Sequence, residues 1–239
     1  RYIQVREKEK LSHNRQIAEL EMKALRAQMN PHFIFNCLNS INNFILHDEN
    51  RQASKYLTKF SKLIRQILDN TDTPLAPVER IVTFMNLYVE LEQMRFGNNR
   101  FDFEVIIAPD IDPHETVFPT MMIQPHVENA IWHGLMHRQE RGKITMAFSR
   151  ENPHFVSCRV EDNGVGRVKS RALSHTLSPS RKSKGTQNVL ESIETFNRQY
   201  NTEGAKIIID DLYDDQGLAC GTRVKIVLPD LAQMELRKR

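Results

Sequence analysis

The sequence predicts an α+β protein in which helical segments come first and strands follow. Up to residue 95 the apolar residues recur at helical spacings of three and four. From Phe101 to Ile107 apolar and polar residues alternate, which is typical of a half-buried strand. Helices and strands segregate unevenly along the chain, so we expect an α+β layer and not a doubly wound sheet. We divide the chain accordingly into a helical region, residues 1–97, and a sheet domain, residues 98–239.

The helical region is expected to hold a helical hairpin preceded by an amphipathic helix. Residues 8–28 contain strong helix formers with no Gly or Pro, and their apolar stripe fits either a helix packed on its own core or the seam of a parallel dimer. Pro31 lacks an amide hydrogen and should kink or restart the helix, which then runs to about residue 47. Two hairpins related by symmetry would form a four-helix bundle. Further helices are expected at residues 52–70 and 77–95.

The sheet domain is expected to contain five strands and two helices. Beyond the strand that starts at Phe101, strands are expected at residues 143–149, 155–161, 205–211 and 222–228, and helices at residues 121–135 and 186–200. Residues 166–185 are polar and lack a clear period, so they predict a mobile loop.

Composition limits the classes of function. The 239 residues, 40% hydrophobic and 26% charged, suffice for one large or two small domains. A net charge of +3 does not indicate direct nucleic-acid binding. The three cysteines are widely spaced and favour a reducing compartment. No apolar run of about 18 residues occurs, and the first residues form no signal peptide, so we expect a soluble piece of a longer protein.

A short acidic and glycine-rich segment follows the predicted strand at 155–161. Glycines such as Gly164 and Gly166 let the backbone approach a ligand closely, and a buried Asp162 is suited to accept a hydrogen bond from an exocyclic amine such as that of adenine. Since Asp and Gly are common turn residues, the segment by itself is a weak signal that more often marks a plain turn. Thr222, which enters the last strand, could place a hydroxyl near the Asp162 carboxylate.

A second polar set lies on the predicted helix at 121–135. Asn129 and His133 are four residues apart and share a face, with Glu128 one position away. Glutamate and asparagine offer the oxygen ligands that suit a magnesium ion bridging phosphates. His133 and His137 also have a spacing that zinc sites use, but no HExxH motif or cysteine partner accompanies them.

A third segment could bind an anion. Lys184, Gly185, Thr186 and Asn188 open the predicted helix at 186–200, and a glycine at a helix start exposes amide hydrogens to a phosphate. The basic residues of the preceding loop fit a solvated charge run as well as a phosphate-binding role.

Taken in order, these segments resemble the GHKL ATPase superfamily over about residues 100–229. The resemblance implies ATP and Mg²⁺ as cofactors and the following roles: Asn129 the magnesium-binding asparagine, Glu128 a polar group near the attacking atom, Asp162 the adenine-reading acid, Gly164 and Gly166 the hinge glycines, Gly185 and Asn188 the second glycine box, and Thr222 the threonine beside an adenine-bound water. Ser183 departs from this pattern, because relatives often have the first glycine of the second box there, and this puts lid closure and nucleotide affinity in doubt.

The segment Asn-Pro-His-Phe-Ile-Phe-Asn at residues 30–36 places His32 one helical turn before Asn36. An isolated histidine is more often a core or capping residue, but this run resembles the phosphoacceptor motif of LytS-type sensor histidine kinases, also called the YehU-like group. Residues 88–96 and 128–134 match the same family, so the similarity spans about residues 18–229. An unprotonated imidazole nitrogen can attack the γ-phosphorus of ATP.

The resemblance implies a homodimeric kinase core that phosphorylates His32 from Mg-ATP and passes the phosphoryl group to an aspartate of a response regulator, commonly of the LytTR type. It also implies a membrane sensor in the missing N-terminal part, and therefore a location at the cytoplasmic side of a membrane. Asn36 could orient a water in dephosphorylation of the regulator. Two alternatives stay open: a GHKL ATPase without kinase activity, and a degenerate kinase that serves as a dimeric scaffold.

Overall fold

The computed structural model describes residues 31–69, 75–96, 100–170, 193–198, 200 and 202–231. The chain divides into two compact units, Arg1–Thr73 and Pro74–Arg239, which we call the helical unit and the sheet unit. The predicted helix at 8–28 lies outside the described residues.

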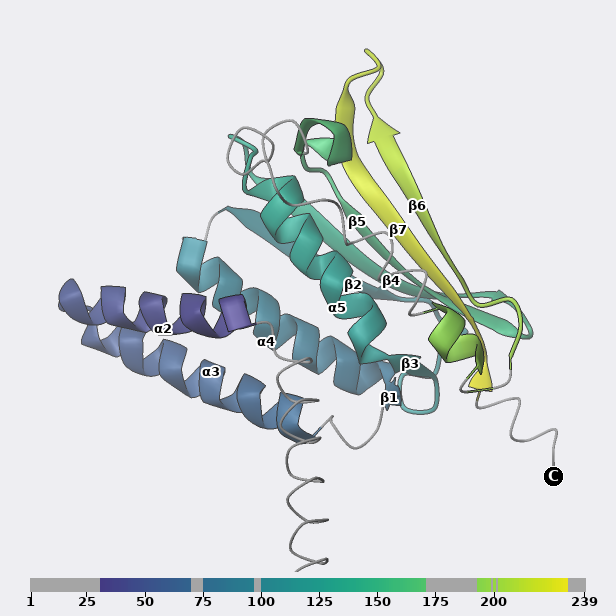
Figure 1. Cartoon of the computed structure of the whole chain (residues 1–239), viewed down its shortest axis with the longest axis horizontal. Helices are drawn as coiled ribbons and strands as arrows, with labels where there is room; N and C mark the ends of the chain where they lie inside the picture. The colour runs from purple at the N-terminus through teal and green to yellow at the C-terminus, as the bar shows by residue number, and fades with distance from the viewer. Residues whose placement is uncertain are drawn as a thin grey trace, which may run out of the picture. The chain divides into compact units, whose positions relative to one another are not determined.

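The described part of the helical unit is a hairpin of two helices, α2 (Pro31–Leu46) and α3 (Asn50–Asp69), as Figure 1 shows. The hydroxyl of Tyr56 on α3 lies 3.4 Å from the Cys37 sulfur on α2, and the rings of Phe44 and Tyr56 are 5.8 Å apart. Both predicted helices are confirmed within two residues of their expected ends, because each carries an apolar face at helical spacing.

One helix of the sheet unit was placed in the helical region by the sequence-based division. Helix α4 (Val78–Phe96) groups with the sheet by its contacts, so the boundary between the units lies before this helix and not after residue 97. Its buried face includes Ile81, Met85 and Leu91. Helical periodicity predicts that a helix has an apolar face, but it does not say which core that face covers.

A five-stranded sheet with helices on one face forms most of the sheet unit (Figure 1). The strands lie in the order β2-β4-β5-β7-β6, and only the pair of β2 and β4 is parallel among the described strands. Their bounds are β2 Phe101–Ile107, β4 Gly142–Asn152, β5 Phe155–Asp162, β6 Lys206–Tyr213 and β7 Ala219–Pro229. All five predicted strands are confirmed, and so is the α+β class.

The two faces of this sheet differ in chemistry. On the inner face Ile144, Met146 and Phe148 alternate along β4 at 1% exposure or less, and helix residues such as Ile123 and Ile131 are equally buried. The outer face is charged and carries cross-strand ion pairs, which are Lys143–Glu104 at 2.8 Å, Arg223–Glu161 at 2.7 Å and Lys225–Glu151 at 2.7 Å. One face is therefore packed and the other solvated, as the alternating sequence predicts.

Three features differ from the expectations or extend them. The strands β1 (Leu75–Pro77) and β3 (Val117–Pro119) form a separate pair that was not predicted, since three residues are too few to show a period. The predicted helix at 121–135 is α5 (Thr120–Asn129) continued by a π-helix, η1 (Ala130–Leu135). Residues 166–170 are helical, so the start of the expected mobile loop was wrong. The rest of that loop lies outside the described residues.

The predicted helix at 186–200 is described only in its second part, where residues 193–198 and 200 are helical. No helix among the described segments is long and apolar enough to cross a membrane.

Candidate functional site

Asp162 ends strand β5 with its side chain enclosed by backbone. The residue is 6% exposed, and the Gly164 amide donates a hydrogen bond of 2.8 Å to its Oδ1. Thr222 on β7 is the direct strand partner of Asp162, and its backbone amide also lowers the Asp162 pKa. Burial raises the Asp162 pKa to about 6, against the opposing effect of these two amides. At neutral pH the group is therefore mainly an ionised hydrogen-bond acceptor.

Two glycines allow the end of η1 to touch the turn that follows Asp162. A Cβ on Gly134 would lie 2.7 Å from the Asp162 Oδ1, and a Cβ on Gly164 would lie 2.4 Å from the backbone carbon of Gly134. The Val165 amide donates to the Gly134 carbonyl at 3.2 Å, which ties the two segments together. The backbone thus encloses the carboxylate closely. Because glycine has no side chain, a ligand could also approach the main chain closely here.

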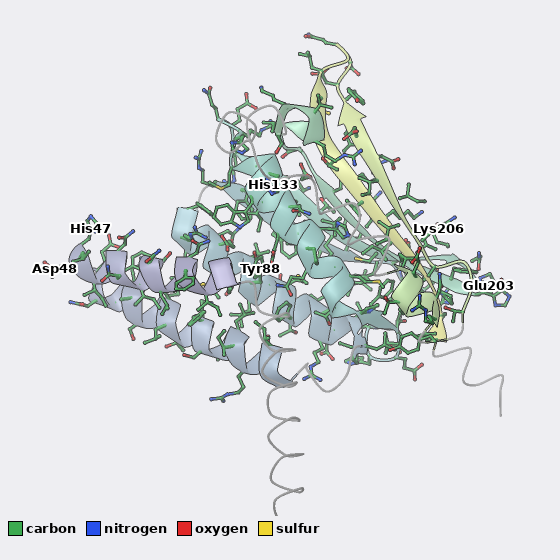
Figure 2. All side chains as sticks on the ribbon, viewed as in Figure 1. His47, Asp48, Tyr88, His133, Glu203 and Lys206 are labelled. Carbon is green, nitrogen blue, oxygen red and sulfur yellow. The ribbon has the colours of Figure 1, made fainter. Side chains whose placement is uncertain are left out.

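The second polar set lies where the helix changes type. Asn129 is the last residue of α5, and His133, labelled in Figure 2, lies in η1; both are exposed. The Met136 amide donates to the Ile131 carbonyl at 3.0 Å, so the turn is wider than the α-helical turn that the spacing argument assumed. Short π-helical turns inside α-helices occur frequently at functional sites.

Glu128 precedes this change and has partners within the sheet unit. It is half-buried, and its Oε1 accepts a hydrogen bond of 2.8 Å from the Gln124 amide nitrogen. His126, two residues earlier, is 6% exposed, and burial lowers its pKa to about 4. His126 is thus a neutral, buried imidazole near pH 7, which favours a structural role for it.

A buried acid on α4 lies near Glu128 and was not singled out from the sequence. Glu92 is 1% exposed, and burial raises its pKa to about 7; Arg95 lowers this pKa and the charge of Glu128 raises it. The Arg95 guanidinium lies 3.5 Å from Glu92 and 4.4 Å from the centre of the Trp132 ring. The sequence did indicate that Glu92 is buried, because Glu92 follows Tyr88 by four residues and so lies on the apolar face of its helix.

Several predicted site residues lie where the structure gives less detail. Lys184, Gly185, Thr186 and Asn188, together with Ser183, lie outside the described residues. His32 is the second residue of α2, and its side chain is not described. Asn36 lies one turn later and is half-buried, and its carbonyl accepts a hydrogen bond of 2.9 Å from the Ser40 hydroxyl.

The remaining predicted residues in the turn are described. Gly166 has a φ of +74°, a conformation that favours glycine, and a Cβ there would lie 2.9 Å from the Ala219 Cβ. Arg167, one of the loop cations, forms two contacts with Asp211 at 2.7 and 2.8 Å. This cation is engaged with the edge strand β6 in the structure.

The donor set fits a nucleotide better than a bare metal ion. An enclosed carboxylate with adjacent glycine backbone suits the amine of a purine base, and the exposed amide of Asn129 suits a magnesium ion that keeps its waters. Within the described ranges no group of three or more His, Cys, Asp or Glu side chains could hold a metal by itself.

Comparison with known proteins connects these features to a family. The histidine kinase family model matches residues 20–101, which include His32. The chain is 31% identical to the sensor protein LytS of Enterococcus faecalis over 196 residues, or 80% of this chain and 32% of LytS. It is 32% identical to the sensor histidine kinase BtsS of Escherichia coli K12 over 147 residues, or 62% of this chain and 25% of BtsS.

The chain is also 29% identical to Bacillus subtilis YwpD over 182 residues, which are 76% of this chain and 64% of YwpD. Among solved structures it is similar to the histidine kinase domain of the EL346 blue-light activated kinase of Erythrobacter litoralis, at a TM-score of 0.46 and 16% identity, covering 92% of this chain and 98% of that one. The chain spans less than two thirds of the length of these three curated relatives. By its family-model match and its relatives in sequence, the chain belongs to the LytS-type sensor histidine kinases.

Proposed function

We propose that this chain is the kinase core of a two-component sensor, which transfers the γ-phosphoryl group of Mg-ATP to His32 and then to an aspartate of a response regulator. The observation that carries the proposal is the enclosed Asp162 carboxylate between Gly134 and Gly164, in a chain whose histidine kinase match includes His32. A nucleotide site and an acceptor histidine together are the minimum that a histidine kinase requires.

In this proposal Asp162 binds the base. Above its pKa of about 6 the carboxylate accepts a hydrogen bond from the exocyclic amine of adenine. Thr222, the strand partner of Asp162, lies beside the base and supports a bridging water. Gly164 and Gly166 let the backbone of the turn approach the ring closely.

The phosphates bind at the other end of the site. Asn129 would hold Mg²⁺, which when bound supplies charge neutralisation across the phosphate oxygens. His133 lies on the next helical turn and can donate to a phosphate oxygen. By their motif, Lys184, Gly185, Thr186 and Asn188 contribute a cation and helix N-terminal amides.

The chemical step is an in-line displacement at phosphorus. A ring nitrogen of His32 forms a bond to the γ-phosphorus as the bond from that phosphorus to the β,γ-bridging oxygen breaks, and ADP leaves. Glu128 polarises the imidazole or accepts its proton. The carboxylate suits this role because it is half-buried and held by Gln124 at 2.8 Å. The phosphohistidine then donates its phosphoryl group to the aspartate of the regulator.

The helical unit supports a role in dimerisation and partner binding. Its described helices expose large apolar side chains, which are Phe35, Leu38, Ile45 and Leu46 on α2 and Leu57 on α3, each at least 49% exposed. Exposed apolar side chains in such number mark a protein–protein contact. We therefore propose that the chain forms a homodimer through this unit.

The resemblance to the family supports three further proposals. The partner is a response regulator of the LytTR type, and Asn36 takes part in dephosphorylation of that regulator. A membrane sensor in the longer protein holds the kinase core at the cytoplasmic side.

Radiolabelled ATP tests the proposal. The wild type and a His47→Gln control, which changes an exposed histidine just beyond α2, should acquire acid-labile, base-stable label, and His32→Gln should acquire none. Label retained by His32→Gln would contradict the assignment of the acceptor. ATP hydrolysis without protein labelling would instead support a GHKL ATPase, and absence of nucleotide binding by calorimetry would support a dimeric scaffold.

A further inference from the structure

Arg138 binds the backbone of the turn that carries Asp162. It lies three residues beyond η1, and its guanidinium donates a hydrogen bond to the carbonyl oxygen of Asn163, the residue that follows Asp162. A second nitrogen of the same guanidinium lies 2.7 Å from a carboxylate oxygen of Glu140. The Arg138 side chain is 26% exposed, whereas that of Glu140 is 81% exposed. Arg138 therefore connects a surface ion pair to a backbone atom beside the enclosed acid.

The same turn is held by main chain on its other sides. The Asn163 side-chain oxygen accepts a hydrogen bond of 2.7 Å from the Lys143 amide, and the Asn163 amide donates to the Lys143 carbonyl at 3.2 Å. The Val165 amide donates to the Gly134 carbonyl at 3.2 Å. Arg138 adds a charged donor to this set, and charge-assisted hydrogen bonds are roughly twice as strong as neutral ones.

The position of the Asn163 carbonyl bears directly on Asp162. The peptide group that contains this carbonyl also contains the Gly164 amide, since a peptide unit is planar. That amide donates the 2.8 Å hydrogen bond to the Asp162 Oδ1. A rotation of this one peptide unit would therefore break both contacts together. By holding its oxygen, Arg138 holds its N–H in the direction of the carboxylate.

Base selectivity depends on the direction of that carboxylate. An acceptor oxygen in a fixed position favours a purine with an amine at position 6 over one with an oxygen there, because the second purine leaves the acceptor without a donor. A carboxylate that can turn away loses part of this discrimination while the rest of the nucleotide still binds.

We propose that Arg138 is a positioning residue for base selectivity, which holds the Asn163–Gly164 peptide so that Asp162 distinguishes an amino purine from an oxo purine. The inference rests on the proposed function, in which Asp162 reads the adenine amine. It assigns a role to a residue outside the motifs of the nucleotide site.

The test compares ADP with inosine diphosphate by titration calorimetry at pH 8, with the whole chain. Arg138→Met keeps the apolar stem and removes the donors, and Arg138→Lys restores a cationic donor. Arg141→Met is the matched control, because Arg141 is also a surface arginine in an ion pair, with Asp102 at 2.5 Å. Glu140→Ala removes the ion pair that holds the guanidinium, and the exposure of Glu140 makes loss of the fold unexpected.

We expect the wild type to prefer ADP by about tenfold or more, and Arg138→Met to lower this preference about fivefold. Arg138→Lys should recover most of the loss, Glu140→Ala should lose about twofold, and Arg141→Met should match the wild type. A purely structural effect would weaken both nucleotides equally and leave the preference unchanged.

Each contrary outcome has a separate meaning. Equal binding of ADP and inosine diphosphate by the wild type would overturn both base reading by Asp162 and this inference. A wild-type preference that persists in folded Arg138→Met would overturn the inference alone and leave the proposed function standing. If circular dichroism shows that Arg138→Met does not fold, an unchanged preference in Glu140→Ala overturns the inference.

Discussion

The two ends of the candidate nucleotide site differ in how strongly packing and hydrogen bonds fix their side chains. At the base end, Asp162 is 6% exposed and is enclosed by glycine backbone and hydrogen-bonded amides. At the phosphate end, Asn129 and His133 are exposed side chains at a change of helix type. The base end is therefore formed by packing within the sheet unit, whereas the phosphate end presents exposed side chains that packing does not fix.

This difference has an energetic side. The enclosed carboxylate gives up hydration, which raises its pKa to about 6, so its ionised form is held at a cost to stability. An exposed asparagine carries no such cost. Substitutions at the two ends should accordingly separate effects on folding from effects on ligand binding.

The largest effect is expected from Asp162→Asn. An amide in place of the acceptor would present the wrong group to the adenine amine and lower ADP affinity about 100-fold. The same change should stabilise the fold at pH 8. Because the folded-state pKa is raised from 3.8 to about 6, the stability from holding this proton is present below pH 3.8 and lost as the pH rises through 6.

An asparagine cannot ionise, so the variant should gain on the order of 2 kcal/mol over the wild type at pH 8 and little at pH 4. Urea unfolding at both pH values measures this. Equal stability of the two proteins at pH 8 would show that the carboxylate is better solvated than its burial indicates.

The second effect concerns the glycine at the end of the turn. Gly166 and Gly217 both have a φ of +74°, so alanine at either position meets the same backbone strain. A Cβ at 166 would also lie 2.9 Å from the Ala219 Cβ, whereas a Cβ at 217 has no heavy atom of the described residues within 4 Å. Gly166→Ala should therefore destabilise the protein by about 1–2 kcal/mol more than Gly217→Ala, and it alone should weaken ADP binding. Equal losses in the two variants would rule out a packing role for Gly166.

The third effect separates the phosphate end from the fold. Asn129→Ala should lower the affinity for ATP about tenfold in the presence of Mg²⁺, because an oxygen ligand is lost. Its unfolding free energy should change by no more than about 0.5 kcal/mol, since the side chain is exposed. ADP binding in EDTA should be unaltered, and Gln139→Ala serves as an exposed control. An equal loss with and without the metal would remove Asn129 from the magnesium site.

The smallest effect is a pH dependence of base preference. Above pH 6 the ionised Asp162 accepts from the adenine amine, and below pH 6 the protonated carboxyl can donate to the oxygen of hypoxanthine. The preference for ADP over inosine diphosphate should thus fall a few-fold between pH 8 and pH 5. Glu92 titrates in the same pH range, with a pKa of about 7, so Asp162→Asn is the control that must abolish the dependence.

Much of the fold could be predicted because the spacing of apolar residues within one segment distinguishes a helix from a strand. The alternation in Phe101–Ile107 defined its strand to the residue, and the order of strands and helices indicated the α+β class. The core to which α4 belongs could not be predicted, because its apolar face would suit a helix bundle as well as a sheet. The π-helical turn of η1 could not be predicted either, since an α-helix and a short π-helical turn have almost the same pattern of apolar residues.

Within the candidate site, local motifs were visible in the sequence and contacts between motifs were not. Thr222 was expected to lie near Asp162, and the two residues are partners on β7 and β5. The contact of Gly134 with Gly164, the hold of Arg138 on Asn163 and the proximity of Glu92 to Glu128 depend on how distant segments pack. Such pairs carry no spacing that a single sequence reveals.

The central claim is that the nucleotide bound by the sheet unit delivers its terminal phosphoryl group to His32. Tandem mass spectrometry at neutral pH, after incubation with Mg-ATP, tests this on the tryptic peptide of residues 27–51, which contains both His32 and His47. The account predicts fragment ions that place the phosphate on His32 in the wild type, and a much weaker phosphopeptide signal in Asp162→Asn. Phosphate on His47, or an unmodified peptide from protein that binds ATP, would contradict it.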